Sequence, residues 1–297
     1  MLLTGNTGFL GRNISKCLQD QYNITSLGRT ESSDIKCDIA REIPVITRKY
    51  DLIIHCSGMA HFVPKNKVDK SLFFKVNFEG TKNLVRGLEY SNMSLPNSFI
   101  FISSVAVYGV ENGINISEEE QLKGSTPYAQ SKIQAEKFLL DWGKETGVNV
   151  SILRLPLICG SRPPGNLGAM IKGIKTGKYF RIGNGNVRKS LVRAVDLAQF
   201  IPKLLQYPGI YNLTDGYHPT FRELENKIAE HFNKKINSLP KNLVRVLAKF
   251  GDYSKRFPIN SEKYHKITSN LTFSDKKARS KFNWNPSPVI DHIDELF

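Results

Sequence analysis

Short apolar runs alternate with amphipathic segments through the first half of the chain. The runs lie at 2–4, 24–27, 51–58, 98–104 and 150–160. Those at 51–58 and 98–104 have the pattern of strands that are buried on both faces. Between the runs, apolar residues recur at helical spacing over 8–21, 68–90 and 127–144. This alternation predicts parallel βαβ units with right-handed crossovers, and therefore an α/β fold with a doubly wound parallel sheet.

The pattern changes after residue 160. The segment 160–168 is predicted to be a loop, and 177–190 a turn-rich hairpin region. Helical spacing returns at 194–206, 220–233, 240–250 and 274–282. We therefore expect a first domain over 1–160, which the chain rejoins at about 188–206. A smaller C-terminal α/β lid domain over 161–297 is expected to bind the substrate.

Three glycines, Gly5, Gly8 and Gly11, stand between the first predicted strand and the first predicted helix. Glycine allows a tight turn there and lets the backbone approach a pyrophosphate, while free N–H groups of the helix N-terminus face the anion. The spacing is GxxGxxG and not GxGxxG, but the strand–turn–helix context is the one that a dinucleotide site requires. The sequence therefore predicts a Rossmann-type NAD(P)-binding domain.

The end of the second predicted strand indicates which dinucleotide binds. NAD-binding proteins of this type usually carry an acidic residue there for the ribose hydroxyls, whereas this chain has Gly28 and Arg29. Arg12 follows the third glycine, and guanidinium groups match the geometry of a 2′-phosphate. We therefore expect NADP(H) in preference to NAD, which stays an alternative.

Composition narrows the choice of partners. The chain has 297 residues, 40% of them hydrophobic, and a formal net charge of +15. Its cations are scattered, and no RNA-binding aromatic motif accompanies them, so nucleic acid is a weaker candidate than an anionic small substrate or a membrane surface. The four cysteines lie far apart, which favours reduced thiols in a cytoplasmic protein over a metal site. The sequence has neither the pattern of a spanning helix nor that of a secretory signal.

A tyrosine and a lysine lie four residues apart, at Tyr128 and Lys132, on one face of a predicted helix. A phenol with a pKa of ~10 exchanges protons poorly at neutral pH, so a nearby ammonium is expected to lower the pKa of Tyr128. Lys132 can also reach the ribose of a cofactor. The predicted strand 98–104 ends in Ser103 and Ser104, and a hydroxyl there can hold a carbonyl oxygen against the tyrosine.

Together these motifs resemble the extended short-chain dehydrogenases/reductases of the nucleotide-sugar epimerase/dehydratase family, over nearly the whole chain. The loop TGNTGFLG and the strand end IIHCSGMA are similar to the family's cofactor motifs. Further similar stretches are KCDIA, NFEGT, RLPLICG, SLVRAVDLAQFI and LTFSDKKARSKFNWNP. The resemblance implies an NAD(P)-dependent enzyme that acts on nucleotide sugars and forms homodimers through helices near 68–90 and 128–147.

The resemblance also assigns roles to residues. Tyr128 is implied to be the proton donor or acceptor. Lys132 is implied to lower the pKa of Tyr128 and to bind the cofactor ribose, and Ser104 to hold the substrate carbonyl with its hydroxyl. Ser103 is interpreted as a buried strand-end hydroxyl. The implied cofactor-binding set adds Gly5, Thr7, Gly8, Phe9, Leu10, Gly11, Arg12, Arg29, Asp38, Ile39, Cys56, Ser57, Gly58, Asn77 and Pro156. The implied substrate-binding set, which suits a UDP-sugar, is Ser104 with His61, Asn166, Phe180, Ile182 and Arg188.

Two residues restrict the reaction. Family dehydratases carry an Asp–Glu pair directly after the catalytic Ser or Thr, and 3,5-epimerases hold a Cys at the second of these two positions. This chain has Val105 at the first position and Ala106 at the second. The remaining reactions need only a hydride and the Tyr128 proton. One is reduction of a UDP-4-keto-6-deoxy-HexNAc for surface polysaccharide synthesis, which NADP(H) favours. The other is 4-epimerisation of a UDP-hexose or UDP-HexNAc with bound NAD. A non-catalytic NADP-binding scaffold is a third reading, against which the intact Ser–Tyr–Lys set argues.

The segment 239–250, LPKNLVRVLAKF, has apolar residues at helical spacing with Lys and Arg between them. Such a helix can rest on a membrane surface or pack on the core of its own domain. Weak membrane-surface association is therefore a hypothesis beside ordinary packing within the lid domain.

Overall fold

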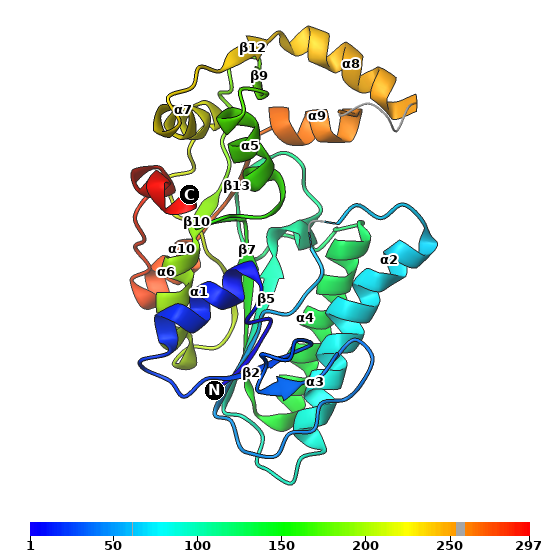
Figure 1. Ribbon diagram of the computed structural model, residues 1–297. Coiled ribbons are helices and arrows are strands. Elements are labelled where there is room, and N and C mark those ends of the chain that lie inside the picture. Colours follow the sequence, from blue (N-terminus) through cyan, green and yellow to red (C-terminus); the bar gives the residue numbers. More distant parts are fainter. Residues whose placement is uncertain (61, 254–258) are drawn as a thin grey trace.

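A seven-stranded parallel sheet, in the order β3-β2-β1-β4-β5-β7-β11, forms the centre of the protein (Figure 1). The structure, a computed structural model, describes residues 1–60, 62–253 and 259–297. The strands are β1 (Leu2–Thr4), β2 (Thr25–Gly28), β3 (Ile35–Lys36), β4 (Leu52–His55), β5 (Ser98–Ser104), β7 (Asn149–Leu155) and β11 (Ile210–Asn212). The strand order reverses between β1 and β4, and ligands of such sheets bind beyond the carboxyl ends of the strands at this point. The predicted doubly wound sheet is confirmed.

Alternating side chains of the central strands pack into two separate hydrophobic cores, one on each face of the sheet. Leu3 and Ile54 pack with α1 (Phe9–Leu18) and α6 (Ala194–Phe200) on one face of the sheet. Leu2 and Ile53 pack on the other face, against α3 (Gly80–Glu89) and α4 (Pro127–Thr146). Helices therefore cover both faces of the central strands, which is why apolar residues dominate β1, β4 and β5 (Figure 1).

Helix α4 has strong local signals at both ends. The Thr126 side chain accepts a hydrogen bond from the Ala129 backbone N–H, and Pro127 occupies the first helical position. Gly147 ends the helix with φ at +77°, which is the left-handed conformation that glycine adopts readily. These signals fix where the helix that carries Tyr128 begins. The predicted helix over 68–90 is divided into α2 (Lys67–Phe74), a π-helical turn (Lys75–Glu79) and α3.

The remaining strands form three parallel pairs outside the main sheet. They are β8 (Leu157–Cys159) with β10 (Leu191–Arg193), β9 (Phe180–Ile182) with β12 (Asn237–Leu239), and β6 (Gly113–Ile116) with β13 (Leu271–Phe273). The helices of this part are α5 (Gly165–Lys175), α7 (Phe221–His231), α8 (Lys241–Tyr253), α9 (Ser261–Thr268) and α10 (Lys276–Phe282). Short 3₁₀ segments occupy Val105–Tyr108, Ile201–Leu205 and Val289–Leu296.

Two expectations for the second half are wrong. The hairpin over 177–190 does not form, because β9 pairs in parallel with β12, which lies more than fifty residues further along the chain. Gly183 and Gly185 both have positive φ and turn the chain away after β9. The predicted loop 160–168 also ends early, because α5 begins at Gly165 and buries Leu167 and Ile174.

The chain does return to the first part after residue 188. Val192, Ala194 and Leu197 lie in the same buried cluster as Leu3 and Leu10. The division into a cofactor domain over 1–160 and a substrate domain over 161–297 stays a prediction.

Candidate active site

The glycine loop between β1 and α1 is packed so tightly that side chains have no room. The Gly8 N–H donates to the Gly5 carbonyl at 2.9 Å, and a Cβ on Gly11 would lie 2.1 Å from that same oxygen. Gly5 has φ of +71°, and a Cβ there would meet the Ser57 backbone nitrogen at 2.8 Å. The loop therefore lies directly against the end of β4. This is a backbone cradle of the kind that admits a pyrophosphate at a helix N-terminus.

The predicted cofactor residues around this cradle come from the ends of neighbouring strands. Thr7 lies in the loop, and Phe9 and Leu10 begin α1. Cys56, Ser57 and Gly58 follow β4, while Asp38 and Ile39 follow β3. The Cys37 N–H, directly after β3, donates to the Gly28 carbonyl at the end of β2. Pro156 lies between β7 and β8.

The end of β2 gathers cationic and hydroxyl groups. Arg29 is exposed there, and Arg12 Nη1 donates to the Thr7 carbonyl at 2.6 Å, which holds the guanidinium over the glycine loop. The hydroxyls of Thr30, Ser32 and Ser33 form a hydrogen-bonded cluster in the turn that follows. A Cβ on Gly28 would lie 2.8 Å from Ser33 Oγ, so this cluster adjoins the strand end.

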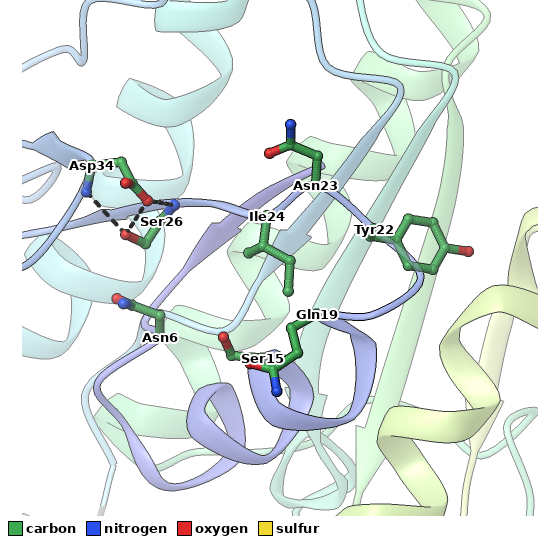
Figure 2. Close-up of a pocket in the computed structure, with 8 residues that line it drawn as sticks. All are labelled: Asn6, Ser15, Gln19, Tyr22, Asn23, Ile24, Ser26 and Asp34. Atoms are coloured by element: carbon green, nitrogen blue, oxygen red, sulfur yellow. Dashed lines mark hydrogen bonds between the residues drawn. The ribbon is translucent and has the colours of Figure 1, made fainter.

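Asn6 is a residue that sequence reasoning missed. Its Oδ1 is buried and has no protein hydrogen-bond partner within the described residues, and it lies 3.6 Å from the Cβ position of Gly28. Asn6 also lines a polar cavity of about 390 Å³ between α1 and β2, shown in Figure 2. On the same wall Asp34 Oδ2 accepts hydrogen bonds from the Ser26 backbone and hydroxyl. The only trace of this role in the sequence is the position of Asn6, an amide side chain between Gly5 and Gly8 of the glycine loop.

Asn77 holds the loop that follows β4. It is fully buried in the π-helical turn, accepts a hydrogen bond from the Met59 N–H at 2.6 Å and donates to the Met59 carbonyl at 3.1 Å. Its amide also donates to Ser131 Oγ on α4. π-Helical turns inside helices occur often at functional sites. Here the turn places one amide so that it fixes the strand-end loop relative to the helix that carries Lys132.

The structure brings Ser104, Tyr128 and Lys132 together, as predicted. The Ser104 side chain lies close enough to the Tyr128 hydroxyl to exert a lowering effect on its pKa. Lys132 is 5% exposed, and its ammonium donates to the Ile102 carbonyl at 2.8 Å. A Cβ on Gly58 would lie 3.2 Å from Lys132 Nζ, so the ammonium borders the loop beyond β4. The three side chains therefore lie at the carboxyl ends of β4 and β5, beside the cradle.

The expected lowering of the Tyr128 pKa is wrong, because the fold buries the phenol. Burial raises the pKa of Tyr128, and the Ser104 side chain opposes this shift. Burial also lowers the pKa of Lys132 to about 8, against weaker opposing effects of Cys56 and Glu136. Tyr128 is therefore a neutral phenol near pH 7, and it can donate a proton.

Ser103 has a separate, structural role. Its hydroxyl donates to Glu136, which forms a buried ion pair with Arg154 at 2.8 Å. Arg154 also donates to the Tyr108 hydroxyl, which in turn donates to Asn212 on β11 at 2.7 Å. This network joins α4 to β5, β7 and β11, and it satisfies every charge that it buries.

Val105 and Ala106 open the 3₁₀ turn that follows Ser104. The Ala106 N–H donates to Ser104 Oγ at 3.2 Å, so the serine also caps this turn. Both side chains are partly exposed beside Ser104. At these two positions the site therefore offers aliphatic surface and no group that exchanges a proton.

Asn166, Arg188 and the two residues on β9 lie on separate segments of the C-terminal part, and no hydrogen bond or ion pair joins these segments' side chains among the described residues. Asn166 is exposed in the first turn of α5, and Phe180 and Ile182 lie on β9. Arg188 is exposed, and its Nη1 donates to the His218 carbonyl at 2.9 Å. His61 lies outside the described residues.

Comparison with known proteins assigns the chain. A relative from Escherichia coli O157:H7, named N-acetyl-alpha-D-glucosaminyl-diphospho-ditrans,octacis-undecaprenol 4-epimerase, is 27% identical over 94% of this chain and 88% of its own length. A UDP-glucose 4-epimerase from Vibrio cholerae is also 27% identical, over 98% of this chain and 92% of its own. The structure of RMD from Pseudomonas aeruginosa complexed with NADPH has a TM-score of 0.71 at 22% identity, covering 99% and 97% of the two chains.

The family profile described as NAD dependent epimerase/dehydratase matches residues 1–214, which include the glycine loop and the Ser104–Tyr128–Lys132 site. The cradle fits a nicotinamide dinucleotide, because glycine backbone faces a helix N-terminus and a buried lysine borders the neighbouring strand ends. The chain therefore belongs to the NAD dependent epimerase/dehydratase family, and it is an NAD(P)-dependent enzyme of the epimerase and reductase type.

Proposed function

We propose that this protein uses NADPH to reduce the C4 ketone of a UDP-4-keto-6-deoxy-HexNAc for surface polysaccharide synthesis. The observation that carries the proposal is the chemistry at the end of β2. Arg29 and the hydroxyls of Thr30, Ser32 and Ser33 lie there, and the carboxylate of Glu31 is engaged by Lys36. Cations and hydroxyls bind a 2′-phosphate, whereas ribose hydroxyls usually meet a carboxylate. A net reductase needs the cofactor that this environment favours.

The residues beyond β5 suit proton transfer at one oxygen. Bound NADPH supplies the hydride to C4. The neutral Tyr128 hydroxyl donates its proton to the C4 oxygen, and Ser104 holds that oxygen in place. Lys132 positions the cofactor ribose and keeps a positive charge near the phenol. The aliphatic Val105 and Ala106 supply no acid–base pair for the removal of water.

The C-terminal part supplies candidate contacts for the rest of the substrate. Arg188 is the proposed partner of the diphosphate, because a guanidinium forks around phosphate oxygens. Asn166 at the start of α5 is the proposed second contact with this group. Phe180 is 49% exposed on β9, so its ring is available to pack on the uracil with Ile182.

A second candidate is 4-epimerisation with tightly bound NAD. The relatives from Escherichia coli and Vibrio cholerae described above are both named as 4-epimerases, and the name of the first gives a polyprenyl-diphosphate sugar as its substrate. The same Ser104–Tyr128–Lys132 set serves this reaction, because an epimerase oxidises C4 and then reduces it.

One assay separates the two candidates. The purified enzyme is incubated with NADPH and a UDP-4-keto-6-deoxy-HexNAc, and cofactor oxidation is followed by absorbance. Stoichiometric oxidation supports the reductase. Interconversion of UDP-GlcNAc and UDP-GalNAc without added cofactor, together with a failure to oxidise NADPH, contradicts it.

Cofactor choice has its own test. Arg29→Ala is expected to weaken NADPH binding roughly 10- to 100-fold and to leave NADH binding unchanged, because only NADPH presents a 2′-phosphate. Lys16→Ala is the matched control, since Lys16 is an exposed cation on α1 away from the strand end. Tighter binding of NADH than of NADPH by the unchanged enzyme contradicts the proposed preference.

Further proposals concern assembly and location. We propose a cytoplasmic location and a homodimer through α2, α3 and α4. Of these helices, α3 and α4 pack on one face of the sheet, and α2 packs beside α4. Sedimentation velocity tests the dimer. A monomer at micromolar concentration argues against it.

A further inference from the structure

We propose that α8 docks on an anionic membrane surface through a stripe of exposed apolar side chains. The stripe consists of Leu243, Val246, Phe250 and Tyr253, which are between 49 and 94% exposed. This inference does not depend on which C4 reaction the enzyme performs, because the stripe lies on a helix that contains none of the proposed catalytic residues. Figure 1 shows α8 at the outer end of the C-terminal part, beside α9.

The stripe is not the face by which α8 packs on its own protein. Val244 and Ala248 are the buried residues of the helix, at 3% and 1% exposure. At 100° per residue, the four members of the stripe fall within an 80° arc that is centred nearly opposite these two. The fold therefore buries one apolar face of α8 and leaves a second apolar face exposed. A contiguous exposed apolar patch of this kind marks an interaction surface.

Charge selects the kind of surface. Arg245 and Lys249 flank one edge of the stripe, about 80° and about 40° around the helix from Tyr253, and both side chains are exposed. The one acid of α8, Asp252, accepts hydrogen bonds from the Ser261 backbone and hydroxyl at the start of α9. The edge is therefore cationic, and cations beside apolar residues match anionic lipid headgroups above an acyl boundary.

The geometry favours a helix that lies in the interface. No helix in the described ranges is long and apolar enough to cross a membrane. The N-terminus of α8 is anchored near β9, where the Lys241 side chain packs on Gly183. Docking through α8 would hold the proposed substrate-binding part of the enzyme next to the membrane, where lipid-linked carriers receive sugars.

Vesicle flotation tests the proposal with the full-length protein. The probes are vesicles of pure phosphatidylcholine and vesicles that contain about one third phosphatidylglycerol. We expect binding to the anionic vesicles that weakens at high salt. Each cation near such a surface contributes about a fivefold change in binding. Arg245→Glu/Lys249→Glu is therefore expected to remove the preference for anionic vesicles, and Val246→Ser/Phe250→Ser to reduce binding at least about tenfold.

A matched control uses apolar residues that are equally exposed elsewhere. Val45→Ser/Ile114→Ser removes two side chains that are 77% and 70% exposed and distant from α8 in the fold, and it is expected to leave vesicle binding unchanged. Thermal melting and circular dichroism verify that every variant is folded. The proposal is overturned if the unchanged protein does not float with anionic vesicles. It is also overturned if Arg245→Glu/Lys249→Glu and Val246→Ser/Phe250→Ser both bind these vesicles as well as the unchanged protein does. It is also overturned if Val246→Ser/Phe250→Ser leaves vesicle binding intact and dissociates a dimer, because the stripe would then cover a second copy of the chain.

Discussion

Replacement of Lys132 by methionine should stabilise the cofactor-free protein at neutral pH while it abolishes turnover. Methionine nearly matches the volume of the lysine side chain but carries no charge. Burial lowers the pKa of Lys132 from 10.5 to about 8. At 1.36 kcal/mol per unit, this shift corresponds to about 3 kcal/mol by which folding disfavours the protonated amine. Loss of the hydrogen bond to the Ile102 carbonyl costs about 1 kcal/mol, so the expected net gain is about 2 kcal/mol at pH 7.

The pH dependence identifies the cause. Between pH 8 and 10.5 the unfolded chain binds more protons at Lys132 than the folded chain, so the stability of the unchanged protein rises with pH in this window. The advantage of Lys132→Met should therefore be constant below pH 8, decline above it and disappear by about pH 10.

Urea denaturation from pH 7 to 10, followed by circular dichroism, measures this difference. Lys137→Met is the matched control, because Lys137 is exposed on the same helix. Its stability relative to the unchanged protein should not vary with pH across this range. A stability difference between Lys132→Met and the unchanged protein that stays flat from pH 7 to 10 would refute the argument that burial disfavours the protonated form of Lys132.

The remaining predictions concern the serine pair, the glycine loop and the pH profile. Ser104→Ala should lower kcat roughly 100-fold without a change in melting temperature, whereas Ser103→Ala should leave kcat intact and cost about 1–3 kcal/mol of stability, because Glu136 loses a buried donor. Gly11→Ala should abolish cofactor binding in a fluorescence titration, since its Cβ would lie 2.1 Å from the Gly5 carbonyl oxygen, while Gly177→Ala, which meets open space, should not. For the unchanged enzyme, kcat for reduction should fall as pH rises through about 8, where Lys132 loses its proton; a rate that is flat to pH 10 would contradict this role.

The sheet and the glycine loop were predictable because their signals are local. A strand that is covered on both faces is predominantly apolar, and residues 99–102 of β5 meet this condition. The glycines follow the first such strand directly, so their meaning needs no distant contact. The errors arose where local signals conflicted. Pro163, Pro164 and Gly165 suggested a loop, although Leu167, Ile171 and Ile174 have the spacing of a helix.

Long-range pairing and burial were beyond the reach of the sequence. The pairing of β9 with β12 joins segments that no local pattern connects, so turn-forming glycines were read as a hairpin. The π-helical turn at Asn77 has nearly the same apolar spacing as an ordinary α-helix, so the sequence pattern cannot distinguish the two. The Tyr128–Lys132 spacing gave the pair, but the direction of the Tyr128 pKa shift depends on how deeply the fold buries the phenol.

The contacts between β5 and α4 explain why Ser103 and Ser104 have different roles. Three consecutive residues of the strand end, 102–104, interact with three residues of α4 that are spaced one turn apart. The pairs are Ile102 with Lys132, Ser103 with Glu136, and Ser104 with Tyr128. One face of the helix is thereby fixed against the strand end at successive turns, over about 12 Å of its length. Glu136 directs both carboxylate oxygens to Arg154, so it does little to stabilise the nearby ammonium of Lys132, and burial then dominates the pKa of that lysine. The network that positions α4 therefore leaves the Lys132 ammonium without an ion pair among the described residues, at the strand ends where the cofactor ribose is proposed to bind.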